Sequence, residues 1–282
     1  MRKYFKFLIA FVMIIAITGC GKKERTSLEV LNDAIKNTET VNSGKVNFSV
    51  GVKANYQGMS IDTIFDLGVA AQLENDNNFK AVIDLADNPL IGAQKLYVDK
   101  NGEKALVYMP SKLIDKIAGI ESDYDYWLKE EADFSEIVSN EDNDFNLKDI
   151  NINDLLTDKD FYLVSKENNI GVYRLVVSKE LLMKIDKYFD PESTEDFSEL
   201  KNNLNVDLTI DEKTNRITKV SVDLMEFIKG IELDEEINVT EMVEKCTFEV
   251  EITYGNVTVE IPNDVINNAI TSEEYTNILA NE

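Results

Sequence analysis

Strict alternation of apolar and polar residues over two adjacent stretches is the strongest constraint that this sequence places on its fold. Apolar side chains occupy every even position of 46–56. After Gln57-Gly58 they move to odd positions, at Ile61, Phe65, Leu67, Val69, Ala71 and Leu73. A period of two residues is typical of a strand with one dry and one wet face. The pattern predicts a long antiparallel hairpin, in which each strand spans about 35 to 45 Å at roughly 3.3 Å per residue.

The same alternation returns along the rest of the chain, interrupted by helical periodicity. Strands are predicted at 79–85, 94–98, 104–109, 161–165, 170–178, 206–210, 220–224, 246–254 and 257–261, and amphipathic helices at 26–37, 181–189 and 197–204. Thr26 and Glu29 have the spacing of a capping box at the start of the first helix. Helical spacing around Leu113, Phe134 and Ile152 predicts a helical insert near 110–157. Together these elements predict an α+β fold, in which a long curved antiparallel sheet wraps a group of helices.

The chain begins with a basic and then an apolar segment. Arg2, Lys3 and Lys6 precede the uncharged run 7–17. A basic start followed by about ten apolar residues is typical of a secretory signal peptide. The run is shorter than the roughly 20 residues that a transmembrane helix needs. Residues 1–19 are therefore predicted to be a signal peptide.

The end of this run, Ile17-Thr18-Gly19-Cys20, is similar to the lipobox of bacterial lipoproteins. The resemblance implies that the Cys20 thiol receives a diacylglycerol and that a peptidase cuts just before it. A thiolate is the strong nucleophile among side chains, which explains the need for Cys. Residues 20–25 would then be a lipid-anchored tether, and residues 26–282 a single domain on the extracytoplasmic face of the cell membrane. Two other interpretations are a secretory signal with an unrelated Cys and an uncleaved anchor.

The charge of the chain excludes several partners. It contains 29 basic and 53 acidic residues, a net charge of -24. Removal of residues 1–19 takes away three basic and no acidic residues, which leaves 26 minus 53, or -27. Nucleic-acid binding needs basic surface to neutralise phosphates, so neither DNA nor RNA is an expected partner. Attachment to the membrane would depend on the acyl chains rather than on a basic patch.

Missing residue types exclude much chemistry. The chain has no His, which removes Ser-His-Asp and Cys-His catalysis and nearly every zinc, copper or haem site. After Cys20 only Cys246 remains, so no internal disulfide can form. Asp142, Asp144 and Asp149 lack the Gly and the closing Glu of a calcium loop. We therefore expect no enzyme activity, no metal and no cofactor beyond the covalent diacylglycerol on Cys20.

The order of elements resembles the lipoprotein-carrier-like half-barrels of the LolA and LppX kind, and more closely a group of uncharacterised bacterial lipoproteins with that fold. The resemblance is carried by the first helix running into 46–56, by 108–127, by the turn 211–216, and by 254–262. It implies a half-barrel over nearly all of the mature chain, with an apolar or amphipathic ligand in the concave face of the sheet.

Two groups of residues are candidates for ligand binding. Tyr124, Tyr126 and Trp127 form the densest aromatic cluster, which suits the mouth of an apolar cavity or a small separate core beneath the insert. The dry faces of the strands would line the interior of the half-barrel or simply pack on helices. The predicted ligand-binding residues are Phe48, Val50, Phe65, Val69, Tyr108, Tyr124, Tyr126 and Trp127.

Two functions follow from this sequence. The first is a lipoprotein that binds a lipid or a cell-envelope intermediate. The alternative is a protein-interaction or sensor module that meets an envelope protein and has no small-molecule ligand.

Overall fold

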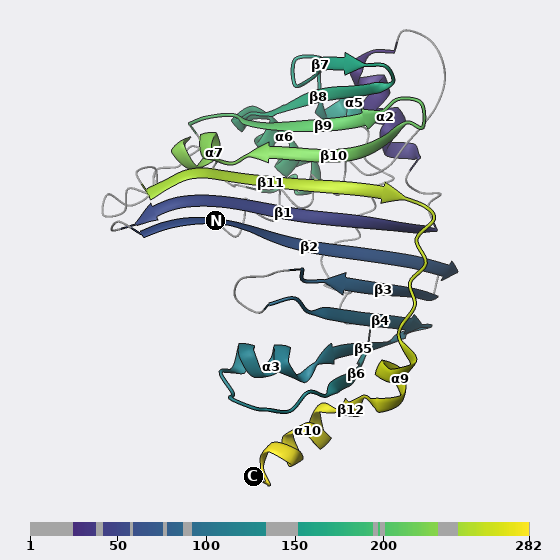
Figure 1. The fold of residues 1–282 in the computed structure, drawn as a ribbon. Coiled ribbons are helices and arrows are strands. Elements are labelled where there is room, and N and C mark those ends of the chain that lie inside the picture. Colours follow the sequence, from purple (N-terminus) through teal and green to yellow (C-terminus); the bar gives the residue numbers. More distant parts are fainter. Residues whose placement is uncertain are drawn as a thin grey trace. The chain divides into compact units, whose positions relative to one another are not determined.

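A computed structural model provides the structure of the chain (Figure 1). It describes residues 25–37, 42–56, 59–75, 78–86, 92–133, 152–193, 197, 201–230 and 242–281. The predicted signal peptide, Cys20, the helix expected around Phe134, and Asp142, Asp144 and Asp149 lie outside these ranges. None of the helices within these ranges is long and apolar enough to cross a membrane.

The described strands belong to a 12-stranded sheet in the order β12-β6-β5-β4-β3-β2-β1-β11-β10-β9-β8-β7. In chain order they are β1 Ser43–Tyr56, β2 Met59–Asn75, β3 Asn78–Asp84, β4 Lys95–Asn101, β5 Lys104–Pro110, β6 Trp127–Asp133, β7 Phe161–Glu167, β8 Ile170–Val177, β9 Leu204–Asp211, β10 Arg216–Asp223, β11 Val243–Tyr254 and β12 Ile270–Thr271. The described registers are antiparallel, except that β12 runs parallel to β6. The predicted α+β class with a long antiparallel sheet is confirmed.

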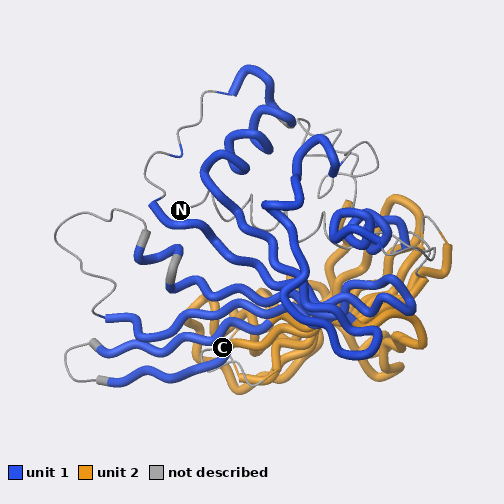
Figure 2. Tube along the Cα trace, turned by 90° about the horizontal axis from the view of Figure 1, so that it is seen from above, with its two compact units in different colours: residues 1–41, 49–64, 145–252 blue, residues 42–48, 65–144, 253–282 orange. Residues whose placement is uncertain are grey.

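The helices connect or follow these strands. They are α2 Ser27–Lys36, α3 Ser111–Ala118, α5 Ile152–Leu155, α6 Lys179–Phe189, α7 Met225–Gly230, α9 Asn263–Asn268 and α10 Ser272–Leu279. The chain divides into two compact units (Figure 2). Unit 1 contains residues 1–41, 49–64 and 145–252, and unit 2 contains residues 42–48, 65–144 and 253–282.

Unit 1 has a closed core between the strands β7 to β10 and its helices. Alternate side chains of β9, from Leu204 to Ile210, are almost fully buried, as are Leu175 on β8 and Val220 on β10. Helix α2 contacts β7 and β10, and α5 contacts both α2 and α6. These alternate apolar side chains are therefore sealed from water, which provides the main stabilisation of the unit.

Helix α2 begins as its sequence predicts. Thr26 is the N-cap: its hydroxyl accepts a hydrogen bond from the Glu29 N–H, and the Glu29 carboxylate accepts one from the Thr26 N–H. This capping box satisfies two N–H groups that the first helical turn leaves without partners. Val30, Leu31 and Ala34 are the buried residues of the helix.

Three predicted elements are wrong in whole or in part, and the available sheet edges explain the first two. Residues 127–133, expected within the helical insert, form strand β6, in which Leu128 pairs with Met109 and is buried. Residues 257–261, expected as a strand after the turn at Gly255-Asn256, lie outside the sheet. The preceding strand β11 already has β1 and β10 on its two sides, so it offers no edge for another strand. The helix predicted for 197–204 is also wrong at its end, because Leu204 begins β9.

Candidate functional site

The registers of unit 2 divide its sheet into two faces. Val69 pairs with Ile83, and the next residue, Ala70, pairs with Val82. Val82 in turn pairs with Tyr97 of β4, and Tyr97 pairs with Tyr108 of β5, so Ala70, Val82, Tyr97 and Tyr108 share one face. Successive side chains of a strand point to opposite faces, so Val69 and Tyr108 lie on opposite faces of the sheet.

The face that carries Val69 is almost entirely apolar, and we call it the apolar face. On strands β2 to β5 it comprises Phe65, Leu67, Val69, Ala71 and Leu73 of β2, Phe79, Ala81 and Ile83 of β3, Leu96, Val98 and Lys100 of β4, and Ala105, Val107 and Met109 of β5. Phe48 of β1 lies on the same face, because its neighbour Asn47 stands beside Gly68 on the other face. Val50, two residues further along β1, belongs to unit 1.

Most side chains of the apolar face are only half-buried, and Leu73 is 44% exposed. Ala81 and Ala105, which are small, are the buried members among β3 to β5. This differs from unit 1, where the corresponding side chains of β9 are fully enclosed. Lys100 is the single charged residue of the face on β2 to β5, and its Nζ lies 6.0 Å from the centroid of the Phe79 ring. On β6, Glu130 is the register partner of Val107 and lies on the same face. The apolar face thus has an apolar centre and a cationic group at its rim.

Tyr108 and Trp127 belong to a core on the opposite face. Tyr108 is 4% exposed and packs with Ile261, Val265 and Ala269 of the C-terminal segment, while Trp127 flanks this cluster. The same segment is held to the sheet by the Val259 N–H, which donates to Gln72 Oε1 at 3.0 Å. Burial, followed by the charge of Asp99, raises the pKa of the Tyr108 phenol. This placement fits the alternative interpretation, a small separate core, for Trp127.

Tyr124 and Tyr126 lie at a third place, next to helix α10. Their ring centroids are 5.6 Å apart, and the Tyr126 ring meets Tyr275 edge-on at 6.1 Å. The Tyr275 hydroxyl donates to Asp115 Oδ2 at 2.8 Å and lies 3.2 Å from the Ser122 hydroxyl. These contacts join α10 to α3. The eight predicted ligand-binding residues therefore do not form one cluster.

Asp115 and Tyr275 are residues that sequence reasoning missed. Both are 3% exposed, and Asp115 Oδ1 has no hydrogen-bond partner among the described residues. An acidic residue in a short amphipathic helix carries no local sign of burial. Burial is the leading cause that raises the pKa of the Tyr275 phenol.

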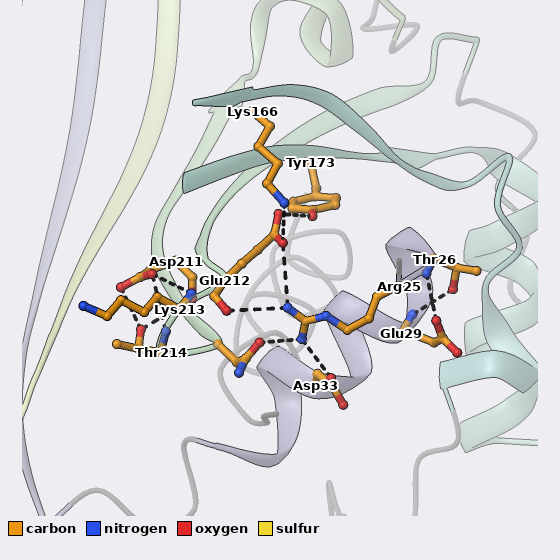
Figure 3. A network of polar contacts seen from close by, with 11 residues as sticks. Arg25, Thr26, Glu29, Asp33, Lys166, Tyr173, Asp211, Glu212, Lys213 and Thr214 are labelled. Carbon is orange, nitrogen blue, oxygen red and sulfur yellow. Dashed lines mark hydrogen bonds and ion pairs between the residues drawn. The ribbon is translucent and has the colours of Figure 1, made fainter. Parts of the chain in front are cut away.

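A polar network in unit 1 holds the start of the described chain (Figure 3). Arg25 Nη1 lies 2.9 Å from Asp33 Oδ2 and donates to Asn215 Oδ1 at 2.5 Å. Arg25 Nη2 lies 3.7 Å from Glu212 Oε2. Asn215 is buried with a φ of 49°, a left-handed conformation that Asn tolerates better than most residues. Arg25, predicted only as part of a tether, is therefore fixed to the β9–β10 turn.

Glu212 is the centre of this network. Its carboxylate also accepts hydrogen bonds from Lys166 Nζ at 2.6 Å and from the Tyr173 hydroxyl at 2.8 Å. Burial by itself would raise the pKa of Glu212, but these hydrogen bonds and the charges of Lys166 and Arg25 hold it below its ordinary value. Burial and the hydrogen bond to Glu212 raise the pKa of Tyr173. The network is thus built around an ionised carboxylate.

The described residues contain no group of three or more His, Cys, Asp or Glu side chains that could hold a metal ion. The chemistry that they offer is an apolar surface, a cationic rim and structural ion pairs.

No family model matches the chain, and no curated protein matches its sequence. Several solved structures are similar to it. LprF from Mycobacterium bovis has 9% identity and a TM-score of 0.36, and the match covers 84% of this chain and 96% of that one. A putative outer membrane lipoprotein-sorting protein domain from Vibrio parahaemolyticus has 11% identity and a TM-score of 0.27, with 85% and 96% covered. A LolA superfamily protein from Nitrosomonas europaea has 13% identity and a TM-score of 0.22, with 86% and 97% covered.

Proposed function

We propose that this chain is an extracytoplasmic lipoprotein, anchored to the cell membrane through Cys20, that binds an apolar or amphipathic ligand on the apolar face of unit 2. The observation that carries the proposal is a contrast in side-chain burial between two sets of strands. On β8 to β10 alternate apolar side chains are almost fully buried, whereas strands β2 to β5 leave a row of apolar side chains half-exposed on the apolar face. A large exposed apolar surface on a chain with a net charge of -24 is costly unless something binds it.

The proposed site is narrower than the set expected from the sequence. It contains Phe48, Phe65 and Val69 together with their neighbours on β3 and β4, whereas Val50 belongs to unit 1 and is not part of it. Tyr108 and Trp127 are assigned to the core beneath the C-terminal segment instead. Lys100 at the rim favours a ligand with an anionic or polar head and an apolar tail, such as a lipid or an envelope intermediate. No catalytic role is assigned to any residue.

Adjacent residues on β2 provide a matched test. Ala71 lies on the apolar face and Ala70 on the opposite face, and both are half-buried. The purified protein should bind the fluorescent apolar probe N-phenylnaphthylamine, and native mass spectrometry after gentle extraction should detect bound lipid. Ala71→Glu should weaken probe binding at least tenfold, whereas Ala70→Glu should leave it nearly unchanged. Equal binding by both variants, or a wild-type protein that never carries or binds an apolar molecule, would refute the proposal.

The alternative function, a protein-interaction module, has its own test. Cross-linking in cells should then trap one dominant envelope protein, and Ala71→Glu and Ala70→Glu should both bind N-phenylnaphthylamine as weakly as the wild type does. A wild-type protein that binds the probe in the manner proposed above contradicts this alternative.

A further inference from the structure

The attachment of Arg25 determines which part of unit 1 lies near the lipid anchor. Four residues, Gly21 to Glu24, separate Arg25 from Cys20. Five Cα–Cα steps reach at most roughly 18 Å. Because Arg25 is bound to Glu212 and Asn215 at the β9–β10 turn, a lipid on Cys20 would keep this end of unit 1 close to the bilayer.

The neighbouring surface is the β7–β8 hairpin. Lys166 of β7 and Tyr173 of β8 both donate to the Glu212 carboxylate that pairs with Arg25. Leu163 is the register partner of Tyr173 across the hairpin. The outer strand of the hairpin therefore lies beside the point at which the tether reaches the domain (Figure 3).

This outer strand exposes an unusual run of apolar side chains. Tyr162, Leu163 and Val164 are 40%, 44% and 47% exposed, and Ile170 across the turn is 42% exposed. β7 is the last strand of the sheet among the described strands. Its register shifts between Leu163 and Ser165, which places apolar groups on both sides of the edge. Exposed aliphatic residues beside a Tyr suit the boundary between lipid headgroups and acyl chains.

Local charge permits this contact, although the chain as a whole is acidic. Residues 158–177 contain three basic residues (Lys159, Lys166, Arg174) and three acidic ones (Asp158, Asp160, Glu167), so the hairpin has a net charge of 3 minus 3, or zero. The chain as a whole carries -24. Residues 21–25 add three basic residues and one acidic residue. Lys166 and Arg174 are paired with Glu212 and Asp207 of the neighbouring strand and turn, so the hairpin brings no excess of positive charge. Because its own net charge is zero, it meets less repulsion from an anionic bilayer than the acidic average of the chain would.

We propose that the β7–β8 hairpin is a membrane-contact surface, in which Leu163 and Val164 enter the headgroup region of the bilayer that holds Cys20. The inference depends on the anchoring part of the proposed function and is independent of ligand binding. Its physical effect is to orient unit 1 on the membrane, because a single lipid tether fixes distance but not orientation.

Depth-dependent quenching tests this orientation with the lipidated full-length protein. Trp127 is the single Trp of the chain, so Trp127→Phe provides a silent background. In the Trp127→Phe background, Leu163→Trp is compared with Met183→Trp. Met183 lies on α6 of the same unit, and its side chain has a similar exposure of 37%. The vesicles contain phosphatidylcholine and phosphatidylglycerol with bromine on the acyl chains near the headgroups. Leu163→Trp should be quenched at least threefold more strongly than Met183→Trp and should emit at shorter wavelength.

Flotation of the same samples distinguishes a failure of the membrane-contact surface from a failure of the lipid anchor. Protein that floats with the vesicles but shows equal quenching at both positions overturns the membrane-contact surface and leaves anchoring intact. Protein that does not float, or that lacks a lipid on Cys20 by mass spectrometry, overturns both. If Trp127→Phe unfolds, bimane attached to Leu163→Cys or Met183→Cys in a Cys246→Ser background gives the same comparison with Trp127 in place.

Discussion

Replacement of Glu212 by Gln should destabilise unit 1 strongly, because it removes the negative charge at the centre of the Arg25 network. The Glu212 side chain is 11% exposed and faces three donors: Lys166 at 2.6 Å, Tyr173 at 2.8 Å and Arg25 at 3.7 Å. Gln keeps nearly the same shape and one acceptor oxygen. Its NH₂ group, however, would face a donor and cannot accept a hydrogen bond.

The expected cost follows from these contacts. A hydrogen bond to a charged group contributes about 1.5 to 3 kcal/mol, and a buried donor left without a partner costs a similar amount. One such hydrogen bond is lost, and the remaining contacts lose their charge assistance. We expect Glu212→Gln to lower the free energy of unfolding of unit 1 by about 2 to 3 kcal/mol. This corresponds to a loss of about 30- to 150-fold in hydrogen-exchange protection.

Native-state hydrogen exchange should detect this loss of protection in unit 1. The exchange is measured by mass spectrometry on peptides from β8 and β9. Glu131→Gln is the matched control, because Glu131 pairs with Lys104 in unit 2 and both side chains are more than half exposed. An exposed pair contributes little, so the control should leave protection in β8 and β9 unchanged. A Glu212→Gln effect no larger than that of the control would refute the reasoning.

The same network predicts the direction of a pH effect. Because the pKa of Glu212 is lowered in the folded state, its contribution is fully present above the ordinary carboxyl pKa. It is lost as the pH falls through the lowered pKa. The difference in stability between the wild type and Glu212→Gln should therefore shrink as the pH falls below about 4. A difference that stays constant down to pH 2 would contradict the role of the ionised carboxylate.

Three further predictions concern other parts of the chain. Tyr275→Phe should destabilise the attachment of α10 by about 1 to 3 kcal/mol, because the buried Asp115 carboxylate loses its hydrogen-bond donor. Limited proteolysis should then cleave α10 sooner than in the wild type. Unchanged cleavage would argue against this contact. Phe161→Ala should lower the stability of unit 1 by about 3 to 5 kcal/mol in urea unfolding, because its ring is fully buried, and a cost below 1 kcal/mol would mean that the site is not closed. Burial, followed by the charge of Asp223, raises the pKa of the Cys246 thiol, so alkylation of Cys246 near pH 8 should be slow. Alkylation should be faster in Asp223→Asn or in urea. Labelling of the folded wild type as fast as that of a free thiol would contradict this environment.

Local sequence predicted most of the secondary structure and one helix terminus in detail. The alternation in 46–73 gave strands β1 and β2, and Thr26 with Glu29 gave the capping box of α2, because both signals depend on neighbouring residues alone. The apolar members of the candidate site on β1 and β2 were predictable for the same reason. The signal peptide and the lipid on Cys20 remain predictions.

Which strands pair and which distant segments pack together depended on the tertiary structure. No local pattern shows that Trp127 begins a strand beside β5, that residues 257–261 find no free edge, or that Asp115 is buried under α10. The register from β2 to β5 placed Val69 and Tyr108 on opposite faces, which separated an exposed apolar surface from a core. The alternation of a strand determines that it has two faces. Only the pairing of strands and the packing of distant segments decide which face is covered.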